Sequence, residues 1–346
     1  MAPPISVAFR IIERPFVLWS HDPQSENMEF LDSIDSDFYH RTVQTLFCDG
    51  EGKLRIDTDS GDARKDVSSL ARLIWNHGLE TLVMLLGAYI QAPFAVHGFF
   101  LKCENKDCRE IARYLLSGRI PESNCLTLSQ FDFDAFVRGI HAGTVWVNDG
   151  ATMSNFSRSL RSMLLEYDRG DLRAEYNSIK HGLRAHHGRF AVAFGLEETP
   201  GVPAPEENMT MLSDSVDGSH FLTVKAFPNV SKKIQREQFS VQHSSVGWSL
   251  EKTLLDIQIF SSWIGNVVSA FKIAMGAQPK SVQFFRPDVD AEWWEAYFGE
   301  YGSNVQNFTF GGIVDLPQKF DDAEKQASKY YRDQANARAR KNEQED

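Results

Sequence analysis

The sequence has little of what marks the best-defined protein classes. Its 346 residues include only 4 cysteines, too few for the disulfide framework of a small secreted protein. The opening residues, MAPPISVAFRIIERP, lack the basic and then apolar segments of a secretory signal. The most apolar stretch, Leu79 to Val96, is interrupted by Glu80 and Pro93, so it falls short of the ~20 residues that span a bilayer. We therefore expect a cytoplasmic protein with reduced thiols and no membrane partner.

The motifs of several large enzyme classes are missing as well. The chain has no G-x-x-x-x-G-K-[ST] phosphate loop, no G-x-G-x-x-G after a strand, no G-x-S-x-G and no H-E-x-x-H. ATP hydrolysis, dinucleotide redox chemistry and α/β-hydrolase catalysis therefore lack their usual support. We expect no cofactor.

Metal ligands are also sparse. Cys103 and Cys108, spaced C-x4-C, would supply half of a zinc site, and nearby only Cys125 and His97 could add to it. The ligand set is therefore incomplete. We predict that the protein holds no metal.

The composition nevertheless describes a folded protein. With 42% hydrophobic and 12% aromatic residues, the chain can bury a substantial core as one large domain or two ordinary ones. Its formal charge of −11 excludes a surface that is basic everywhere. A nucleic acid would therefore have to bind a local positive patch.

Apolar residues at helical spacing predict that helices dominate the fold. The two longest patterns run from Asp66 to Pro93 and from about Val246 to Met275, and shorter ones cover residues 107–116, 129–141 and 156–167. Period-two alternation predicts strands instead in the region of about 188–230, at Phe190 to Leu196 and His220 to Phe227. We predict a mainly α fold: a helical bundle with an inserted β-hairpin, α+β overall.

The same patterns divide the chain into segments. The first contains β-like runs at Ser6 to Ile12 and Lys53 to Asp57. Aromatic residues between Trp293 and Tyr301 could stack on bases, but this spacing is more typical of core packing. The predicted segments are a mixed N-terminal part (1–65), the helical bundle (66–276) with its β insertion (about 188–230), an aromatic extension (277–317), and a charged helix or disordered tail (318–346).

The most informative stretch is Asp171 to His187, DLRAEYNSIKHGLRAHH, which we predict to be a single helix. Asn177 and His181 lie four residues apart, so a helix would place them on one face. A neutral histidine can accept a proton from a ribose 2′-hydroxyl, and an amide beside it can orient the phosphate. Cations on the same flank would stabilise the added charge of the phosphate, and the candidates are Arg173, Lys180 and Arg184.

The run from Ala174 to His181 resembles the φ-R-N-x-x-x-H signature of the HEPN (higher eukaryotes and prokaryotes nucleotide-binding) superfamily. One position departs from it, because Tyr176 stands where the signature has arginine. The resemblance implies a helical domain, a homodimer, and binding or metal-independent cleavage of RNA or a nucleotide, often in toxin or defence settings. Arg173 or Arg184 would have to replace the missing cation for cleavage.

A second polar group, Asn76, His77 and Glu80, interrupts the long apolar pattern. A buried carboxylate must be paired or neutralised, so we expect Glu80 to meet Arg173, Lys180 or His181 on a facing helix. The group would then support Asn177 and His181 from behind, or form a structural network without chemistry. A metal site built on His77 and Glu80 lacks a second Glu-x-x-His pair.

Two functions therefore remain open at this point. The first is an RNA-binding protein or endoribonuclease with Asn177 and His181 as the catalytic pair. The second is a non-catalytic interaction or sensor module, which the tyrosine at position 176 favours. Basic residues cluster around this stretch, but arginines at such spacing also commonly pair with acidic neighbours such as Glu166 and Asp168.

Overall fold

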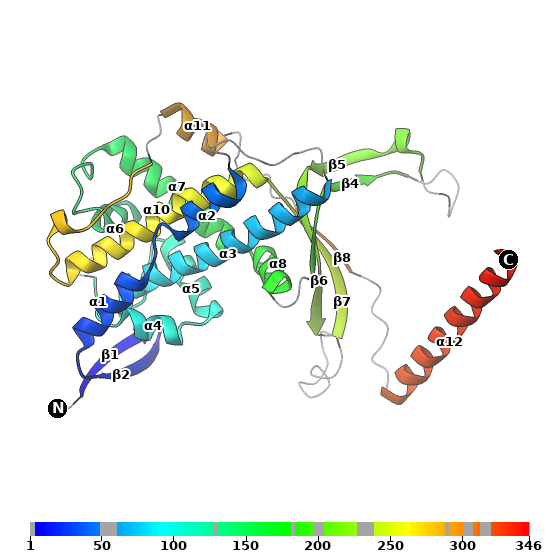
Figure 1. Cartoon of the computed structure of the whole chain (residues 1–346), viewed down its shortest axis with the longest axis horizontal. Coiled ribbons are helices and arrows are strands. Elements are labelled where there is room, and N and C mark those ends of the chain that lie inside the picture. The colour runs from blue at the N-terminus through cyan, green and yellow to red at the C-terminus, as the bar shows by residue number, and fades with distance from the viewer. Residues whose placement is uncertain are drawn as a thin grey trace. The chain divides into compact units, whose positions relative to one another are not determined.

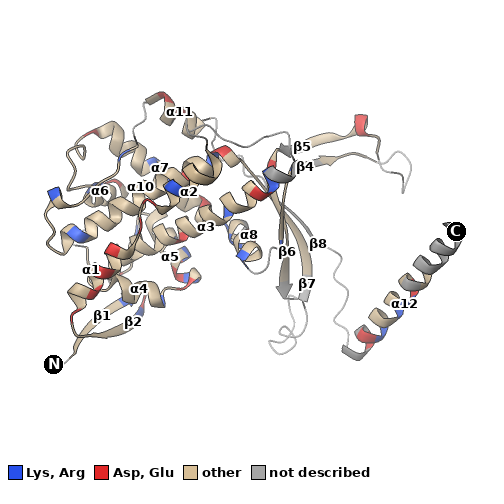
Figure 2. Ribbon diagram, in the orientation of Figure 1, with Lys and Arg blue, Asp and Glu red and all other residues tan. Residues whose placement is uncertain are grey.

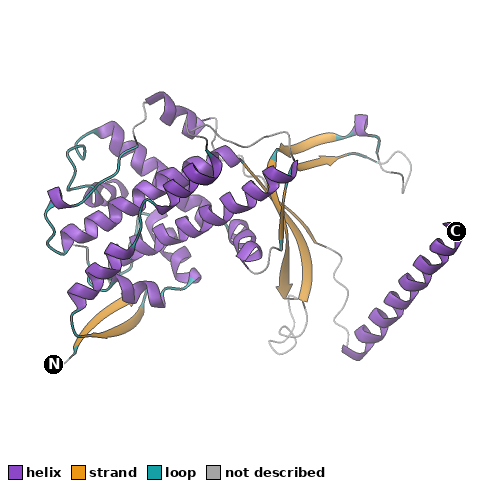
Figure 3. Ribbon diagram, viewed as in Figure 1, coloured by secondary structure: helices purple, strands orange, loops and turns teal. Residues whose placement is uncertain are grey.

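The computed structural model describes residues 4–48, 61–122, 124–126, 131–180, 184–196, 202, 204–226, 239–287, 291–299, 307–311 and 320–345. The fold is mainly helical with some β structure, as the sequence predicts (Figure 3). The chain divides into two compact units. The first comprises residues 1–222 and 244–308, and the second comprises residues 223–243 and 309–346.

Two long helices, α3 (Gly61–Gln91) and α10 (Leu250–Ala274), lie side by side at the centre of the first unit (Figure 1). They run in the same direction: the Trp75 indole donates to Asp256, and further along both helices Tyr89 stacks edge-on against Phe271. Both helices are long and apolar enough to cross a membrane, but 67% and 83% of their most apolar windows are buried inside the protein. Such burial is typical of the core helices of a soluble protein.

The close packing of α3 on α10 depends on a glycine. A Cβ at Gly78 would overlap the ring of Phe260, so only glycine allows this approach. The remaining helices of the first unit contribute to one apolar core with α3 and α10. These helices are α1 (Pro23–Ser33), α2 (Phe38–Phe47), α4 (Val96–Lys102), α5 (Asn105–Leu116), α6 (Phe133–Ile140), α7 (Gly150–Asp168), α8 (Gly170–Lys180) and α11 (Ala291–Gly299).

The N-terminal residues belong to the same core. Strands β1 (Ile5–Ile11) and β2 (Arg14–Ser20) pair antiparallel, and Phe9 and Ile11 are buried in the core cluster. Between the strands Ile12 adopts a φ of 56°, which is unfavourable for a β-branched residue. The Gln91 amide at the end of α3 accepts from the Ile12 N–H (2.8 Å) and donates to its carbonyl (2.9 Å), which holds this turn. The predicted strand at Lys53 to Asp57 lies outside the described residues.

The strands of the middle region do not pair as the sequence predicts. Strand β4 (Phe190–Phe194) pairs with β5 (Thr210–Ser215), whereas β6 (Asp217–Ala226) belongs to a separate sheet of order β3-β6-β7-β8. The predicted hairpin between residues 190–196 and 220–227 is therefore wrong. The reason is that polar sequences form two unpredicted strands, β5 and β7 (Phe239–Trp248). The sheet also contains β3 (Ala185–His187) and β8 (Asn307–Gly311).

Two helix boundaries also need correction. Helix α8 ends at Lys180 and residues 185–187 form β3, so the predicted helix does not continue to His187. The long closing helix begins at Leu250, because Val246 to Trp248 belong to β7. In the second unit, residues 320–345 form α12 (Phe320–Glu345), and its described side chains are exposed.

Candidate functional site

Helix α8 carries most of the residues that the sequence selects. Its apolar side packs inward as predicted, with Leu172 and Ile179 at 2% and 5% exposure. Arg173 and Asn177 are half-buried and Lys180 is exposed. Residues 181–183 lie outside the described part of the chain, so the relation of Asn177 to His181 stays a prediction.

The polar flank of α8 has few partners. Within the described residues, Asn177 has no side-chain hydrogen bond and Arg173 has no ion pair. The Lys180 ammonium lies over the Tyr176 ring, 4.9 Å from its centroid. Arg184, just beyond the undescribed residues, is exposed, and its backbone N–H donates to the Ser178 carbonyl at 2.9 Å.

The residue of α8 that contacts Glu80 is Tyr176. Its hydroxyl is hydrogen-bonded to the carboxylate, and burial together with the charge of Glu80 raises the pKa of the phenol. Tyr176 therefore remains a protonated donor at neutral pH. It satisfies Glu80 without supplying a positive charge, at the position where the resembled φ-R-N-x-x-x-H signature has arginine.

The three residues predicted to support the site from α3 do not act together. Asn76 is buried and donates to the Arg72 carbonyl at 2.9 Å, and both Asn76 and Glu80 face α8 in a small pocket. His77 is exposed, and its Nδ1 is hydrogen-bonded to the Tyr39 hydroxyl of α2 at 2.8 Å. His77 therefore contacts α2 rather than this pocket, since one residue along a helix turns the side chain by about 100°.

The pocket lies between α3, α5, α7 and α8, and it brings together two arginines. Arg173 comes from α8 as the sequence predicts, and Arg109 comes from α5. Figure 2 shows basic residues on both helices. The lining residues are Trp75, Asn76, Glu80, Asn105, Arg109, Tyr167, Leu172, Arg173 and Tyr176.

Arg109 is the unusual member of this set. Its Nε is fully buried and has no hydrogen-bond partner. Burial lowers the pKa of this guanidinium, and the positive charges of Arg173 and Arg113 lower it further. Arg113 itself is paired with Asp168 (Nε to Oδ1, 2.6 Å). An anion beside Arg109 and Arg173 would both satisfy the buried donor and reduce the repulsion.

The pocket is small, with a cavity volume of about 20 Å³. That volume holds roughly one water molecule. It therefore suits a single anionic oxygen at its mouth rather than an enclosed nucleotide. The sequence offered no signal for Arg109, because its helix α5 reads as an ordinary amphipathic helix and Arg109 lies 64 residues before Arg173.

Helix α8 is held against α3 by a buried ion pair. Glu175 (0% exposed) accepts from Arg72 (2% exposed) through two bonds of 3.1 and 2.6 Å. The guanidinium of Arg72 is sandwiched between the rings of Trp75 and Trp248, 4.5 and 4.8 Å from their centroids. A single sequence does not reveal this pair, because its two residues lie 103 positions apart.

The network continues into the four-stranded sheet. The Ser219 hydroxyl donates to Glu175 and accepts from the Trp248 indole at 3.0 Å. His187 Nδ1 lies 3.1 Å from the same hydroxyl, whose only hydrogen is already donated, so Nδ1 carries a proton. Burial lowers the pKa of His187. These bonds join α3, α8, β3, β6 and β7 and fix the wall of the pocket.

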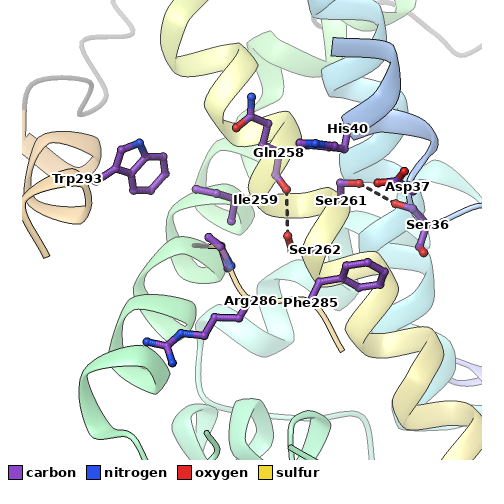
Figure 4. A pocket seen from close by; sticks show the side chains of 11 residues that line it. Ser36, Asp37, His40, Gln258, Ile259, Ser261, Ser262, Phe285, Arg286 and Trp293 are labelled. Carbon is purple, nitrogen blue, oxygen red and sulfur yellow. Dashed lines mark hydrogen bonds between the residues drawn. The ribbon is translucent and has the colours of Figure 1, made fainter. Parts of the chain in front are cut away.

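A larger cavity of about 370 Å³ lies on the other side of α10 (Figure 4). Ser261 donates to the Ser36 carbonyl at 2.7 Å, which fixes one wall, and Trp293 faces the cavity from α11. The charges that line this cavity are paired, since Arg286 meets Asp149 (3.5 Å) and Asp37 meets Arg41 (3.0 Å). None of the predicted catalytic, phosphate-binding or supporting residues lines it, so we place the candidate site at α3, α5 and α8.

The described residues contain no group of three or more His, Cys, Asp or Glu side chains that could hold a metal ion. All four cysteines are free thiols. The chain matches no protein-family model, no curated protein and no solved structure.

Proposed function

We propose that this protein binds the phosphate groups of RNA at the pocket between α3, α5 and α8. The proposal includes a helical-bundle domain of HEPN type with a β insertion, acting as a homodimer in the cytoplasm. The observation that carries it is the buried Arg109 Nε without an acceptor, beside an Arg173 that has no ion pair with the described side chains. Buried donors in native proteins are nearly always satisfied, so an absent acceptor points to a ligand or an ordered water.

Phosphate fits this pocket better than other anions do. Arginine presents a planar fork of donors that matches phosphate oxygens, and two arginines can bind two of them. The one carboxylate in the lining, Glu80, is hydrogen-bonded by Tyr176. The aromatic side chains of Tyr167 and Tyr176 border the same pocket.

Cleavage would require His181 in addition. In the proposed reaction His181 takes the proton of a ribose 2′-hydroxyl, and the 2′-oxygen attacks the adjacent phosphorus. The bond from phosphorus to the 5′-oxygen breaks, and that oxygen receives a proton from the matching histidine of a second copy. The products are a 2′,3′-cyclic phosphate and a 5′-hydroxyl. Asn177 would orient the phosphate, and Arg173, Lys180 and Arg184 would stabilise its charge.

The test is incubation of total RNA and tRNA with the purified protein in the presence of a chelator. Wild type is compared with His181→Ala and with Arg41→Gln, which removes an exposed charge on α2. The nuclease proposal expects cyclic-phosphate ends from wild type and Arg41→Gln, and none from His181→Ala. Cleavage by all three proteins would mean that His181 is not catalytic.

A second function is favoured by the contact between Tyr176 and Glu80. Because tyrosine supplies no charge at the position of the family's arginine, the protein can be a non-catalytic binding or sensor module. If the protein is such a module, we expect that no variant cleaves RNA in the same assay and that wild type still retains RNA. Absence of both cleavage and retention would contradict RNA as the ligand.

A further inference from the structure

Two cysteines meet at the start of α5. Cys103 ends α4 and immediately precedes Glu104, the N-cap of α5, while Cys108 lies in the first turn. Their Sγ atoms are 3.5 Å apart. Cys103 is the residue before the N-cap, and Cys108 is the fourth residue of the helix. Apolar side chains at these two positions commonly pack together at the start of a helix. Glu104 and Asp107 form a reciprocal capping box between them, which holds both sulfurs in place.

We propose that Cys103 and Cys108 form a reversible intramolecular disulfide. An S–S bond is about 2.05 Å long, so the sulfurs need to approach by only about 1.5 Å, within the reach of side-chain rotation. The other two cysteines serve as references. Cys125 is exposed, and its thiol donates to the Gln91 carbonyl at 3.5 Å; Cys48 is buried at 4% exposure.

The two thiols differ in solvent exposure, and this difference determines which of them reacts first. Cys103 is partly exposed, whereas Cys108 is buried at 1% exposure. The oxidant is a small disulfide such as glutathione disulfide. The Cys103 thiolate attacks one of its sulfurs, forming a mixed disulfide and releasing one glutathione thiolate. The Cys108 thiolate then attacks the Cys103 sulfur and releases the second glutathione. Two electrons pass from the protein to glutathione disulfide, and the two protons of the protein thiols end on the released glutathione.

The environment of the pair slows the first attack. The hydrogen bond with Cys108 and burial raise the pKa of Cys103, so thiolate is scarce. Tyr167, which lines the α3–α5–α8 pocket, is also hydrogen-bonded to Cys108. The disulfide would fix the turn that carries Asn105 and Arg109. The modification itself does not depend on what that pocket binds.

The experiment treats the full chain with glutathione disulfide and follows intact mass and tryptic peptides. Trypsin cleaves after Lys102, Lys106 and Arg109, which separates the cysteines into peptides 103–106 and 107–109. A disulfide therefore appears as a cross-link between these two peptides that dithiothreitol removes. Reaction of the exposed Cys125 confirms in the same sample that the reagent is active.

Three variants make the result decisive. Cys108→Ser should stop at a stable glutathione adduct on Cys103, Cys103→Ser should leave Cys108 unreacted, and Cys125→Ser should form the cross-link as wild type does. The proposal is overturned if wild type retains a glutathione adduct on Cys103, or if both thiols stay free after Cys125 has reacted. Because the readout is mass, it does not depend on RNA binding or cleavage.

Discussion

At the scale of single residues, the protein buries charged side chains and pairs them. Arg72 and Glu175 form one such pair, and Lys252 and Asp256 another, with the Tyr297 hydroxyl donating to Asp256 at 2.5 Å. A buried ion pair adds little net stability over apolar residues of the same shape, but loss of one partner leaves an uncompensated charge. The Arg72–Glu175 pair, between α3 and α8, and the Tyr297–Asp256 bond, between α11 and α10, therefore fix the arrangement of helices more than they stabilise it.

We predict that Glu175→Ala lowers the free energy of unfolding by about 3 to 5 kcal/mol, because it leaves the Arg72 charge buried without a partner. The measurement is a urea titration. The matched control is Arg41→Ala, whose ion pairs with Asp35 and Asp37 are exposed and which should cost less than about 1 kcal/mol. Equal costs for the two variants would contradict a structural role for the buried pair.

His141 should make stability sensitive to acid. It lies in the core against Trp146, Phe156 and Trp263, and burial lowers its pKa from 6.5 to about 4. Because the pKa of His141 is lower in the folded protein, the contribution of the neutral imidazole to the free energy of unfolding is complete above pH 6.5. This contribution is lost as the pH falls through about 4. Between these limits wild type should lose up to about 3 kcal/mol relative to His141→Gln. Parallel pH profiles for the two proteins would rule this out.

Glu166 should act in the opposite direction. Burial and the charge of Asp256 raise its pKa from 4.5 to about 7. Because the pKa of Glu166 is higher in the folded protein, the contribution of the protonated carboxyl to the free energy of unfolding is complete below pH 4.5. This contribution is lost as the pH rises through about 7. Wild type should therefore weaken relative to Glu166→Gln between pH 5 and 8, as urea midpoints would report. Glu110→Gln, at an exposed position, should track wild type across this range.

At the scale of elements, the contact between α3 and α10 determines the core. Gly78→Ala should cost about 1 to 3 kcal/mol, because its Cβ would overlap the Phe260 ring. The same substitution at Gly139 of α6, where a Cβ meets no atom within 4 Å, should instead stabilise by roughly 0.5 to 1 kcal/mol. Thermal unfolding of both variants is the measurement.

A double variant tests whether overlap with the Phe260 ring is the reason that position 78 requires glycine. In a Phe260→Leu background the ring is gone, so Gly78→Ala should cost much less than it does in wild type. An unchanged cost would mean that the glycine is required for a reason other than its approach to Phe260.

Helices could be predicted from the sequence far better than strands. The apolar periodicity of α3, α5 and α10 is strong, because each buries a face over several turns. Strands β5 and β7 could not be recognised, since the segments TMLSDS and FSVQHSSVGW carry polar residues at several positions. Without β5 and β7, the pairing of β4 and β6 could only be guessed, and the guess was wrong.

The site was predictable only where it lies on one helix. Arg173 and Asn177 follow from the spacing along α8. The cost of burying a carboxylate predicts a partner for Glu80 on a facing helix, but Tyr176 takes this place and not the expected Arg173, Lys180 or His181. Arg109 and the partner of Glu175 depend on the packing of helices distant in sequence, which a single sequence does not contain. The tyrosine at position 176 was visible, but its bond to Glu80 was not.

At the scale of the whole molecule, an acidic chain with a formal charge of −11 places two incompletely paired arginines at one pocket. If the pocket binds RNA phosphates as proposed, the protein should contact RNA through few ionic contacts. Its affinity should therefore fall only moderately with salt, with a slope set by the number of phosphates that the arginines contact.

The most direct measurement is filter binding of tRNA between about 50 and 200 mM salt. Wild type is compared with the double variant Arg109→Gln/Arg173→Gln and with Arg41→Gln/Arg119→Gln, which removes the same charge from exposed positions. Phosphate binding by Arg109 and Arg173 predicts at least a roughly tenfold loss of affinity and a salt slope reduced by about two for the pocket variant alone. Equal affinity of the pocket variant and wild type, or an equal loss in the control, would contradict it.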